Sequence, residues 1–234
     1  MIKIIKYDNN PITEIGKVAG ICWGANTTDD SKNYKRGIDC LKNNHGRVME
    51  YTDIEVVIEG YSARVIRELY THIIGTSRLQ ASTRYVDYSD FDYYTPVAIQ
   101  KNEIAKEKYD SCMNTIKDTY KALLDLGIKK EDIGGLLPLN STTKIVLKIN
   151  LRALIHMFNM RTCNRAYIEF RGLMKELKTA LSNLSEEWKY LCDNYFVPKC
   201  IADGYCTETF SCNLMPSKDE VLNQRGKTNE EINK

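Results

Sequence analysis

Side chains that could bind a ligand are most concentrated in residues 78–85, Arg-Leu-Gln-Ala-Ser-Thr-Arg-Tyr. This segment brings two guanidinium groups, hydroxyls, an amide and a phenol into eight residues. A guanidinium is a rigid fork of donors that matches a phosphate, and serine adds a short donor. The segment therefore predicts a site that binds a phosphate and orients a planar ring.

A second cluster lies farther along, where Asn150-Leu151-Arg152 opens a helical pattern that also carries His156 and Arg161. Arg152 and His156 are four residues apart and share one helix face, whereas Arg161 lies roughly opposite at about 100° per residue. Separate faces suit separate ligands or separate subunits. Two such clusters indicate an enzyme that holds a phosphorylated ligand with a second ligand beside it. The alternative is that the two arginines are ordinary surface charges.

Periodicity predicts the elements that position these residues. Strands are expected at 2–7, 17–23, 54–59 and 143–149, and helices at 32–41, from Ser62, at 102–126, after Asn150 and at 165–184. The acidic, tyrosine-rich residues 87–96 are expected to form a surface loop. Because strands and helices alternate irregularly, the order favours an α+β fold over a doubly wound sheet. We expect a main domain over residues 1–195 and a cysteine-containing tail over 196–234, disordered from Pro216 onward.

Composition narrows the class of protein. The chain has 234 residues, 43% of them hydrophobic, and a formal net charge of +2. Basic residues form no long block, which argues against nucleic-acid polymers as partners. The sequence has no apolar run of membrane-spanning length and no signal-peptide pattern at its start, so we expect a cytoplasmic protein away from membranes.

The eight cysteines are then expected as thiols or metal ligands rather than disulfides. Cys200, Cys206 and Cys212 recur every six residues, with Cys192 before them. Structural zinc favours tighter Cys-x-x-Cys knuckles, so free thiols are the favoured interpretation and no metal ligand is assigned.

Taken in order, the motifs resemble those of the flavin-dependent thymidylate synthases, the ThyX family. That family carries an Arg-His-Arg triplet, then Ser-x-Arg-Tyr, Glu-Asp-Ala-Arg-x-x-Leu-Pro, Asn-x-Arg, and an Arg followed by Ala-x-x-Glu. The matching residues here are Ser82-Thr83-Arg84-Tyr85, in part Glu131-Asp132-Ile133-Gly134-Gly135-Leu136-Leu137-Pro138, Asn150-Leu151-Arg152, Arg161 and Ala166-Tyr167-Ile168-Glu169. Upstream, His45 and Glu50 resemble the family's His-x-x-x-x-Glu-His, with Tyr51 in place of the last His. The resemblance covers residues 40 to 180.

The chain departs from this pattern at the triplet, where it reads Thr71-His72-Ile73-Ile74. Counting forward from Gly60 puts His72 on the family histidine, and counting back from Ser82 puts it on the first arginine. Neither register keeps a triplet arginine, and Gly134 stands where the family has another arginine. Our hypothesis is that nearby arginines substitute for them, namely Arg64, Arg67 and Arg78.

The resemblance implies an α+β enzyme with a mixed or antiparallel sheet and long helices, assembled as a homotetramer. It implies conversion of dUMP to dTMP, with methylenetetrahydrofolate supplying the carbon, reduced FAD supplying the hydride and NADPH recharging the flavin. Implied nucleotide-binding residues are Ser82, Thr83, Arg84 and Arg161, and Arg161 is also the implied catalytic residue. Arg78 joins the nucleotide-binding set by our hypothesis that it replaces a missing arginine. Implied cofactor-binding residues are His72, Gln80, Asn150, Arg152 and His156. Two alternatives remain open: an enzyme of this kind acting on another pyrimidine nucleotide, and a nucleotide-binding module without catalysis.

Overall fold

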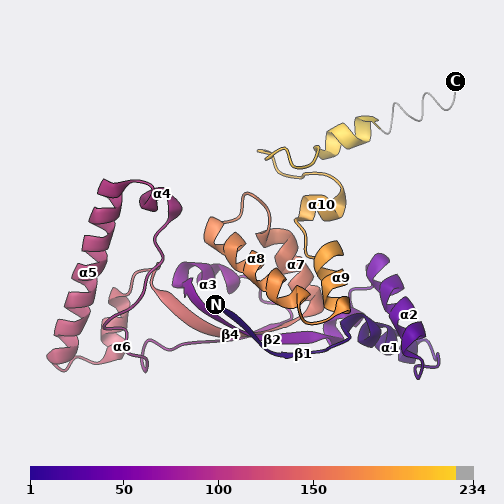
Figure 1. The fold of residues 1–234 in the computed structure, drawn as a ribbon, viewed down its shortest axis with the longest axis horizontal. Coiled ribbons are helices and arrows are strands. Elements are labelled where there is room, and N and C mark those ends of the chain that lie inside the picture. The colour runs from indigo at the N-terminus through magenta and orange to yellow at the C-terminus, as the bar shows by residue number, and fades with distance from the viewer. Residues whose placement is uncertain (225–234) are drawn as a thin grey trace. The chain divides into compact units, whose positions relative to one another are not determined.

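The computed structural model describes residues 1–224 and separates into two compact units (Figure 1). We call residues 1–5 with 55–148 the sheet unit, and residues 6–54 with those from 149 onward the helical unit. The elements, in chain order, are β1 (Ile2–Tyr7), α1 (Pro11–Cys22), α2 (Asp30–Lys42), the 3-10 helix η1 (Val48–Tyr51), β2 (Asp53–Ser62), α3 (Ala63–Leu69), β3 (Thr76–Gln80), α4 (Val97–Gln100), α5 (Glu103–Asp125), α6 (Lys130–Ile133), the 3-10 helix η2 (Gly134–Leu136), β4 (Thr142–Asn150), α7 (Leu151–Arg161), α8 (Ile168–Ser182), α9 (Glu186–Asn194) and α10 (Lys199–Asp203). The fold is α+β, as the order of elements predicted.

The four strands form one sheet in the order β1-β2-β4-β3. Alternate side chains of β2 and β4 are buried, including those of Val56, Ile58, Ile145 and Leu147. On the other face Lys148 pairs with Glu55 and Lys144 pairs with Glu59. Residue numbers therefore increase along β2 in the direction in which they decrease along β4, so these two strands are antiparallel.

The strand expected at 54–59 is longer than predicted, because β2 runs through Gly60 to Ser62. Gly60 has a φ of +82°, a conformation open to glycine at little cost, and the strand passes through it. Ser62 then caps α3 as expected, because its side chain accepts a hydrogen bond from the Val65 amide.

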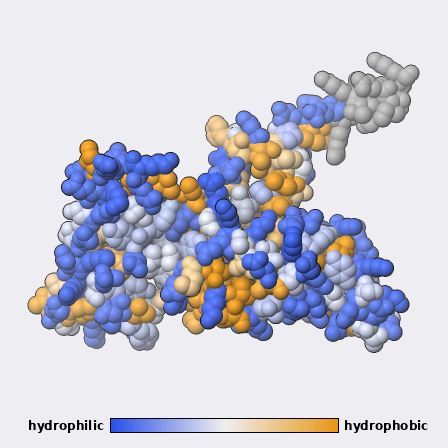
Figure 2. All heavy atoms as spheres, viewed as in Figure 1, coloured by the Kyte–Doolittle hydropathy of each residue, from blue (hydrophilic) through white to orange (hydrophobic). Residues whose placement is uncertain are grey.

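An apolar cluster of the sheet unit lies against α5, whose outer face is largely hydrophilic (Figure 2). The surface-loop expectation for residues 87–96 is corrected here: the backbone is irregular, but Tyr88 and Phe91 are buried in this cluster with Tyr120. Lys117 holds the loop by an ion pair with Asp90 at 2.8 Å. The acidic residues suggested exposure, and packing of the interleaved aromatic side chains decided otherwise.

The helical unit begins with α1 and α2 in close contact. A Cβ added to Gly16 would lie 1.8 Å from the Asn33 carbonyl oxygen, so only glycine allows this approach. The strand expected at 17–23 is wrong, because those residues continue α1 to Cys22. Ile12, Ile15 and Ala19 are buried at helical spacing, a pattern that starts before the window from which the strand was inferred.

The C-terminal helices also differ in detail from expectation. Helix α8 starts at Ile168 rather than at residue 165. Ile168 is exposed, whereas Leu173, Leu177 and Leu181 are buried. Disorder was expected from Pro216, yet residues 218–224 are helical; residues 225–234 lie outside the described part of the chain. Within residues 1–224, none of the helices combines the length and apolar character needed to cross a membrane.

Candidate active site

In the sheet unit, residues 81–86 form a tight turn after β3. The Ala81 amide donates to the Lys144 carbonyl of β4 at 2.8 Å, which fixes where the turn starts. The Ser82 hydroxyl accepts a hydrogen bond from the Arg84 amide at 3.2 Å, and the Ser82 carbonyl accepts from the Val86 amide at 3.0 Å. Ser82 is half-buried and Thr83 and Arg84 are exposed, so this turn presents three predicted nucleotide-binding side chains together.

The turn meets the segment that begins at Glu131. Arg84 Nε and Nη2 each lie 3.0 Å from Glu131 Oε2. Beside this pair, a Cβ added to Gly134 would lie 3.2 Å from Cβ and Oγ1 of Thr83. The backbone at Gly134 therefore approaches the Thr83 side chain closely. Two motifs recognised separately in the sequence are therefore adjacent in the fold.

A surface hollow lies at this junction and is lined by Arg84, Tyr85, Lys129, Lys130 and Glu131. Three cations face one carboxylate, which makes the hollow electropositive and suited to an anion. The hydrogen bonds from Ser89, together with the charge of Lys130, lower the pKa of the neighbouring Asp87 carboxyl. The phosphate group of a nucleotide fits this donor set.

Arg78 contacts the segment that replaces the family triplet. Its Nη1 donates to the carbonyls of Tyr70 at 2.7 Å and His72 at 3.1 Å, and its guanidinium lies 4.8 Å from the centre of the Tyr70 ring. His72 is buried. Gln80 donates to the Thr143 hydroxyl of β4 at 3.4 Å. Arg78 therefore stabilises the turn after α3, and its contact with a nucleotide stays a prediction.

In the helical unit, Asn150 caps α7 as expected, because its Oδ1 accepts from the Ala153 amide at 2.9 Å. Arg152, in the first turn, pairs with Glu50 at 2.6 Å. A Cβ on Gly46 would lie 2.9 Å from Arg152 Nε, so the backbone of that loop approaches the guanidinium closely. His156 is exposed one turn farther along α7.

A hollow beside this loop is lined by Trp23, His45, Gly46 and Arg47, among others. The rings of Trp23 and His45 meet edge to face with centroids 6.5 Å apart. Aromatic surfaces next to cationic side chains suit a planar ligand that carries phosphates, such as a flavin dinucleotide.

Arg161 ends α7 and is half-buried. Its guanidinium carbon lies 4.9 Å from the centre of the Phe170 ring on α8. The unbroken helix from Leu151 to Arg161 is consistent with the expected placement of Arg152 and Arg161 on opposite faces.

Sequence reasoning missed four side chains of these sites: Lys129 and Lys130 in the electropositive hollow, Glu131 as the partner of Arg84, and Glu50 as the partner of Arg152. The two glutamates lay inside motifs of the resemblance, but nothing in their spacing named their arginine partners. The Lys-Lys pair directly before Glu131 was a usable signal for an anion site.

Comparison with solved structures identifies the fold first. The chain is similar to the crystal structure of flavin-dependent thymidylate synthase ThyX from Helicobacter pylori complexed with FAD and dUMP, with a TM-score of 0.65, 22% identity, and coverage of 83% of this chain and 98% of that one. It is also similar to the UMP/dUMP methylase PolB from Streptomyces cacaoi bound with 5-Br dUMP, with a TM-score of 0.68, 18% identity, and coverage of 84% and 96%. At these identities the likeness establishes the fold alone.

Sequence comparison gives the family. The family model described as "Thymidylate synthase complementing protein" matches residues 3–185. The flavin-dependent thymidylate synthase of Nitratidesulfovibrio vulgaris is 33% identical over 191 residues, which are 77% of this chain and 76% of that protein. The chain belongs to the flavin-dependent thymidylate synthase family.

Proposed function

We propose that this protein catalyses the reductive methylation of dUMP to dTMP, with methylenetetrahydrofolate as the carbon donor and FAD as the redox cofactor, recharged by NADPH. The observation that carries the proposal is the electropositive hollow in which the Ser82–Tyr85 turn meets Glu131. It supports the assignment because two family motifs, far apart in sequence, build one anion-binding surface there.

Ser82, Thr83 and Arg84 bind the nucleotide in this proposal, and the charges of Lys129 and Lys130 add to the attraction for its phosphate. Arg161 contacts the uracil and stabilises negative charge on the ring as C5 becomes nucleophilic. An arginine suits that role because it cannot lose its proton in a protein, so its positive charge is fixed. Arg78 keeps the turn at 70–72 in place and contacts the nucleotide from there.

His72, Gln80, Asn150, Arg152 and His156 hold FAD. The exposed cation of Arg152, kept in position by Glu50, supports this assignment. When bound, the reduced flavin supplies the hydride that the protein's own side chains cannot provide. The protein's part is to orient nucleotide, flavin and folate together.

We further propose that the enzyme is a cytoplasmic homotetramer. Apolar residues gather over the strands of the sheet on the face drawn in Figure 2. Ile5 of β1 is 48% exposed and Leu79 of β3 is 74% exposed. Exposed apolar surface of this kind supports a subunit contact.

A second candidate is action on another pyrimidine nucleotide. It is favoured by the loss of family arginines: Gly134 stands in place of one, and neither register of the Thr71–Ile74 segment keeps a triplet arginine. A changed set of cations changes which base and sugar are held, because a site built to bond a polar group discriminates strongly against ligands that lack it.

The test is anaerobic turnover of the reconstituted protein with dUMP, UMP or dCMP, with products identified by mass spectrometry. Formation of dTMP only from dUMP supports the main proposal. A methylated product only from UMP or dCMP supports the second candidate. A purified protein that holds no flavin and oxidises no NADPH with any nucleotide would instead be a binding module.

A further inference from the structure

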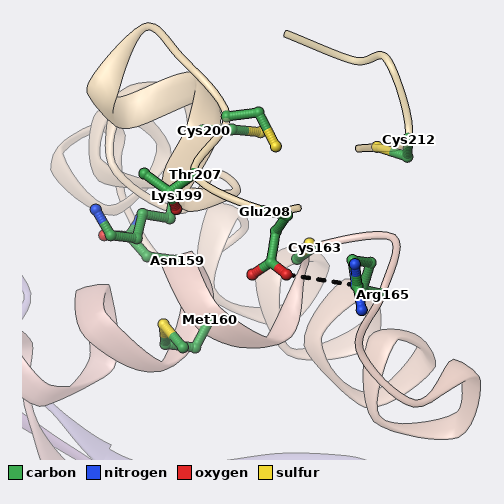
Figure 3. Close-up of a pocket in the computed structure, with 10 residues that line it drawn as sticks. Asn159, Met160, Cys163, Arg165, Lys199, Cys200, Thr207, Glu208 and Cys212 are labelled. Atoms are coloured by element: carbon green, nitrogen blue, oxygen red, sulfur yellow. Dashed lines mark ion pairs between the residues drawn. The ribbon is translucent and has the colours of Figure 1, made fainter. Parts of the chain in front are cut away.

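Four cysteines surround one cavity of the helical unit (Figure 3). Cys163 lies in the loop after α7, Cys200 lies on α10, and Cys206 and Cys212 lie in the segment that follows. In Figure 3 the side chains of Cys163, Cys200 and Cys212 extend into the same space. All four are thiols, and they include residues from both ends of a stretch of about fifty amino acids.

Contacts that do not involve a sulfur–sulfur bond hold the segment around these thiols in place. Arg165 donates to the Phe210 carbonyl at 3.0 Å and pairs with Glu208 at 3.4 Å. Asn164 donates to the sulfur of Cys212 at 3.5 Å. The loop after α7 and the segment 206–212 are therefore held together independently of any bond between sulfurs.

The structure also separates these cysteines from Cys192, which the sequence pattern had grouped with them. Cys192 is fully buried on α9, and its thiol donates to the Lys178 carbonyl at 3.5 Å. Burial raises its pKa to about 12, so it remains a protonated core residue. Cys163, distant in sequence, takes the fourth place around the cavity.

We propose that Cys163, Cys200, Cys206 and Cys212 bind one zinc ion as a structural, four-sulfur site. Zinc in such sites is tetrahedral and accepts four thiolates, which leaves no open position for catalysis. Among residues 1–224, no three His, Cys, Asp or Glu side chains already stand in metal-binding geometry, so binding draws the sulfurs inward to about 2.3 Å from the ion.

Besides the four thiols, the charged side chains that line the cavity are Arg165, Lys199 and Glu208. Four thiols lose their protons on binding, and four thiolates with one Zn²⁺ carry a net charge of −2. Arg165 and Lys199 line the same cavity, and each already has an ion-pair partner, Glu208 for Arg165 and Asp203 for Lys199. Burial first, and then the neighbouring thiols, raise the pKa of Cys200, while the Leu214 amide and Asn164 lower that of Cys212.

The proposed site has a structural consequence for α7. Cys163 is two residues after Arg161, the last residue of that helix. A metal bound there would tie the tail to the helix end that carries the arginine. The role is structural, and it holds whichever nucleotide the enzyme uses.

Zinc content of the full-length protein tests the proposal directly. The purified chain is incubated with Zn²⁺, passed through a desalting column and measured by elemental analysis. We expect about one zinc per chain, falling below about 0.2 in Cys163→Ser and in Cys212→Ser. The control, Cys112→Ser, changes an exposed cysteine of the sheet unit and should keep about one zinc per chain. Replacement by Co²⁺ should give the visible absorption of tetrahedral thiolate cobalt in wild type and control alone.

Two outcomes would overturn the proposal. One is less than about 0.2 zinc per wild-type chain under reducing conditions, with all four thiols alkylated in the native protein as fast in the presence of Zn²⁺ as without it. The other is an intact mass lower by two hydrogens under the same conditions, which would identify a disulfide among these cysteines. The wild-type measurement decides the matter even if a serine variant fails to fold.

Discussion

Replacing Arg84 by alanine tests the nucleotide site most directly. Its ion pair with Glu131 is solvent-exposed, with 62% of the arginine side chain and 40% of the glutamate side chain accessible. Exposed pairs of this kind contribute about 0–1 kcal/mol to folding. A charge-assisted hydrogen bond to phosphate contributes about 1.5–3 kcal/mol. Arg84→Ala should therefore weaken binding of dUMP about 10- to 150-fold and lower the free energy of unfolding by less than about 1 kcal/mol.

Substitution of Glu131, the partner of Arg84, should change dUMP affinity in the opposite direction. Glu131 competes with a phosphate for Arg84 and adds negative charge to the hollow. Glu131→Gln should therefore strengthen binding about two- to fivefold, as removal of a screened repulsion predicts. Lys121→Ala removes an exposed charge elsewhere in the sheet unit and serves as the control.

The measurements are dUMP affinity by titration calorimetry and stability by urea unfolding. An affinity within twofold of wild type for Arg84→Ala would refute the placement of the nucleotide in this hollow. So would equal losses in Arg84→Ala and Lys121→Ala, because general electrostatic attraction would then explain both.

Arg161→Ala should lower kcat/KM for the nucleotide at least about 100-fold while removing about 0.5–1 kcal/mol of stability from its contact with Phe170; steady-state rates within threefold of wild type would contradict its catalytic role. Gly134→Ala places a Cβ 3.2 Å from Thr83 and should raise the dUMP dissociation constant about two- to tenfold by shifting that side chain, whereas unchanged calorimetric affinity would show that Thr83 is not part of the site. Because burial raises the Cys192 pKa from 9.0 to about 12, its stabilising effect is complete below pH 9 and falls by about 1.4 kcal/mol per pH unit above it. Urea unfolding between pH 9 and 10.5 should show a shallower decline for Cys192→Ala than for wild type, and equal slopes would count against a raised pKa.

Most local elements and the family motifs could be predicted from the order of the amino acids. Strong periodicity identified α5 and β4 nearly to their ends, and Asn150 marked the start of α7, because capping and hydrophobic spacing act within a few residues. The ordered motifs identified the family, which the family model and the relatives confirmed. Local signals failed at residues 17–23, where a short apolar window fits both a strand and a buried helix.

Which distant residues contact one another became clear from the folded chain alone. The sequence offered no means of pairing Arg84 with Glu131 or Arg152 with Glu50, because ion pairs between remote segments leave no periodic trace. It grouped Cys192 with the tail cysteines by spacing, whereas the fold buries that thiol and brings Cys163 to the cavity instead. Spacing along a chain records local geometry, and the burial of apolar surface across the whole chain fixes which segments become neighbours.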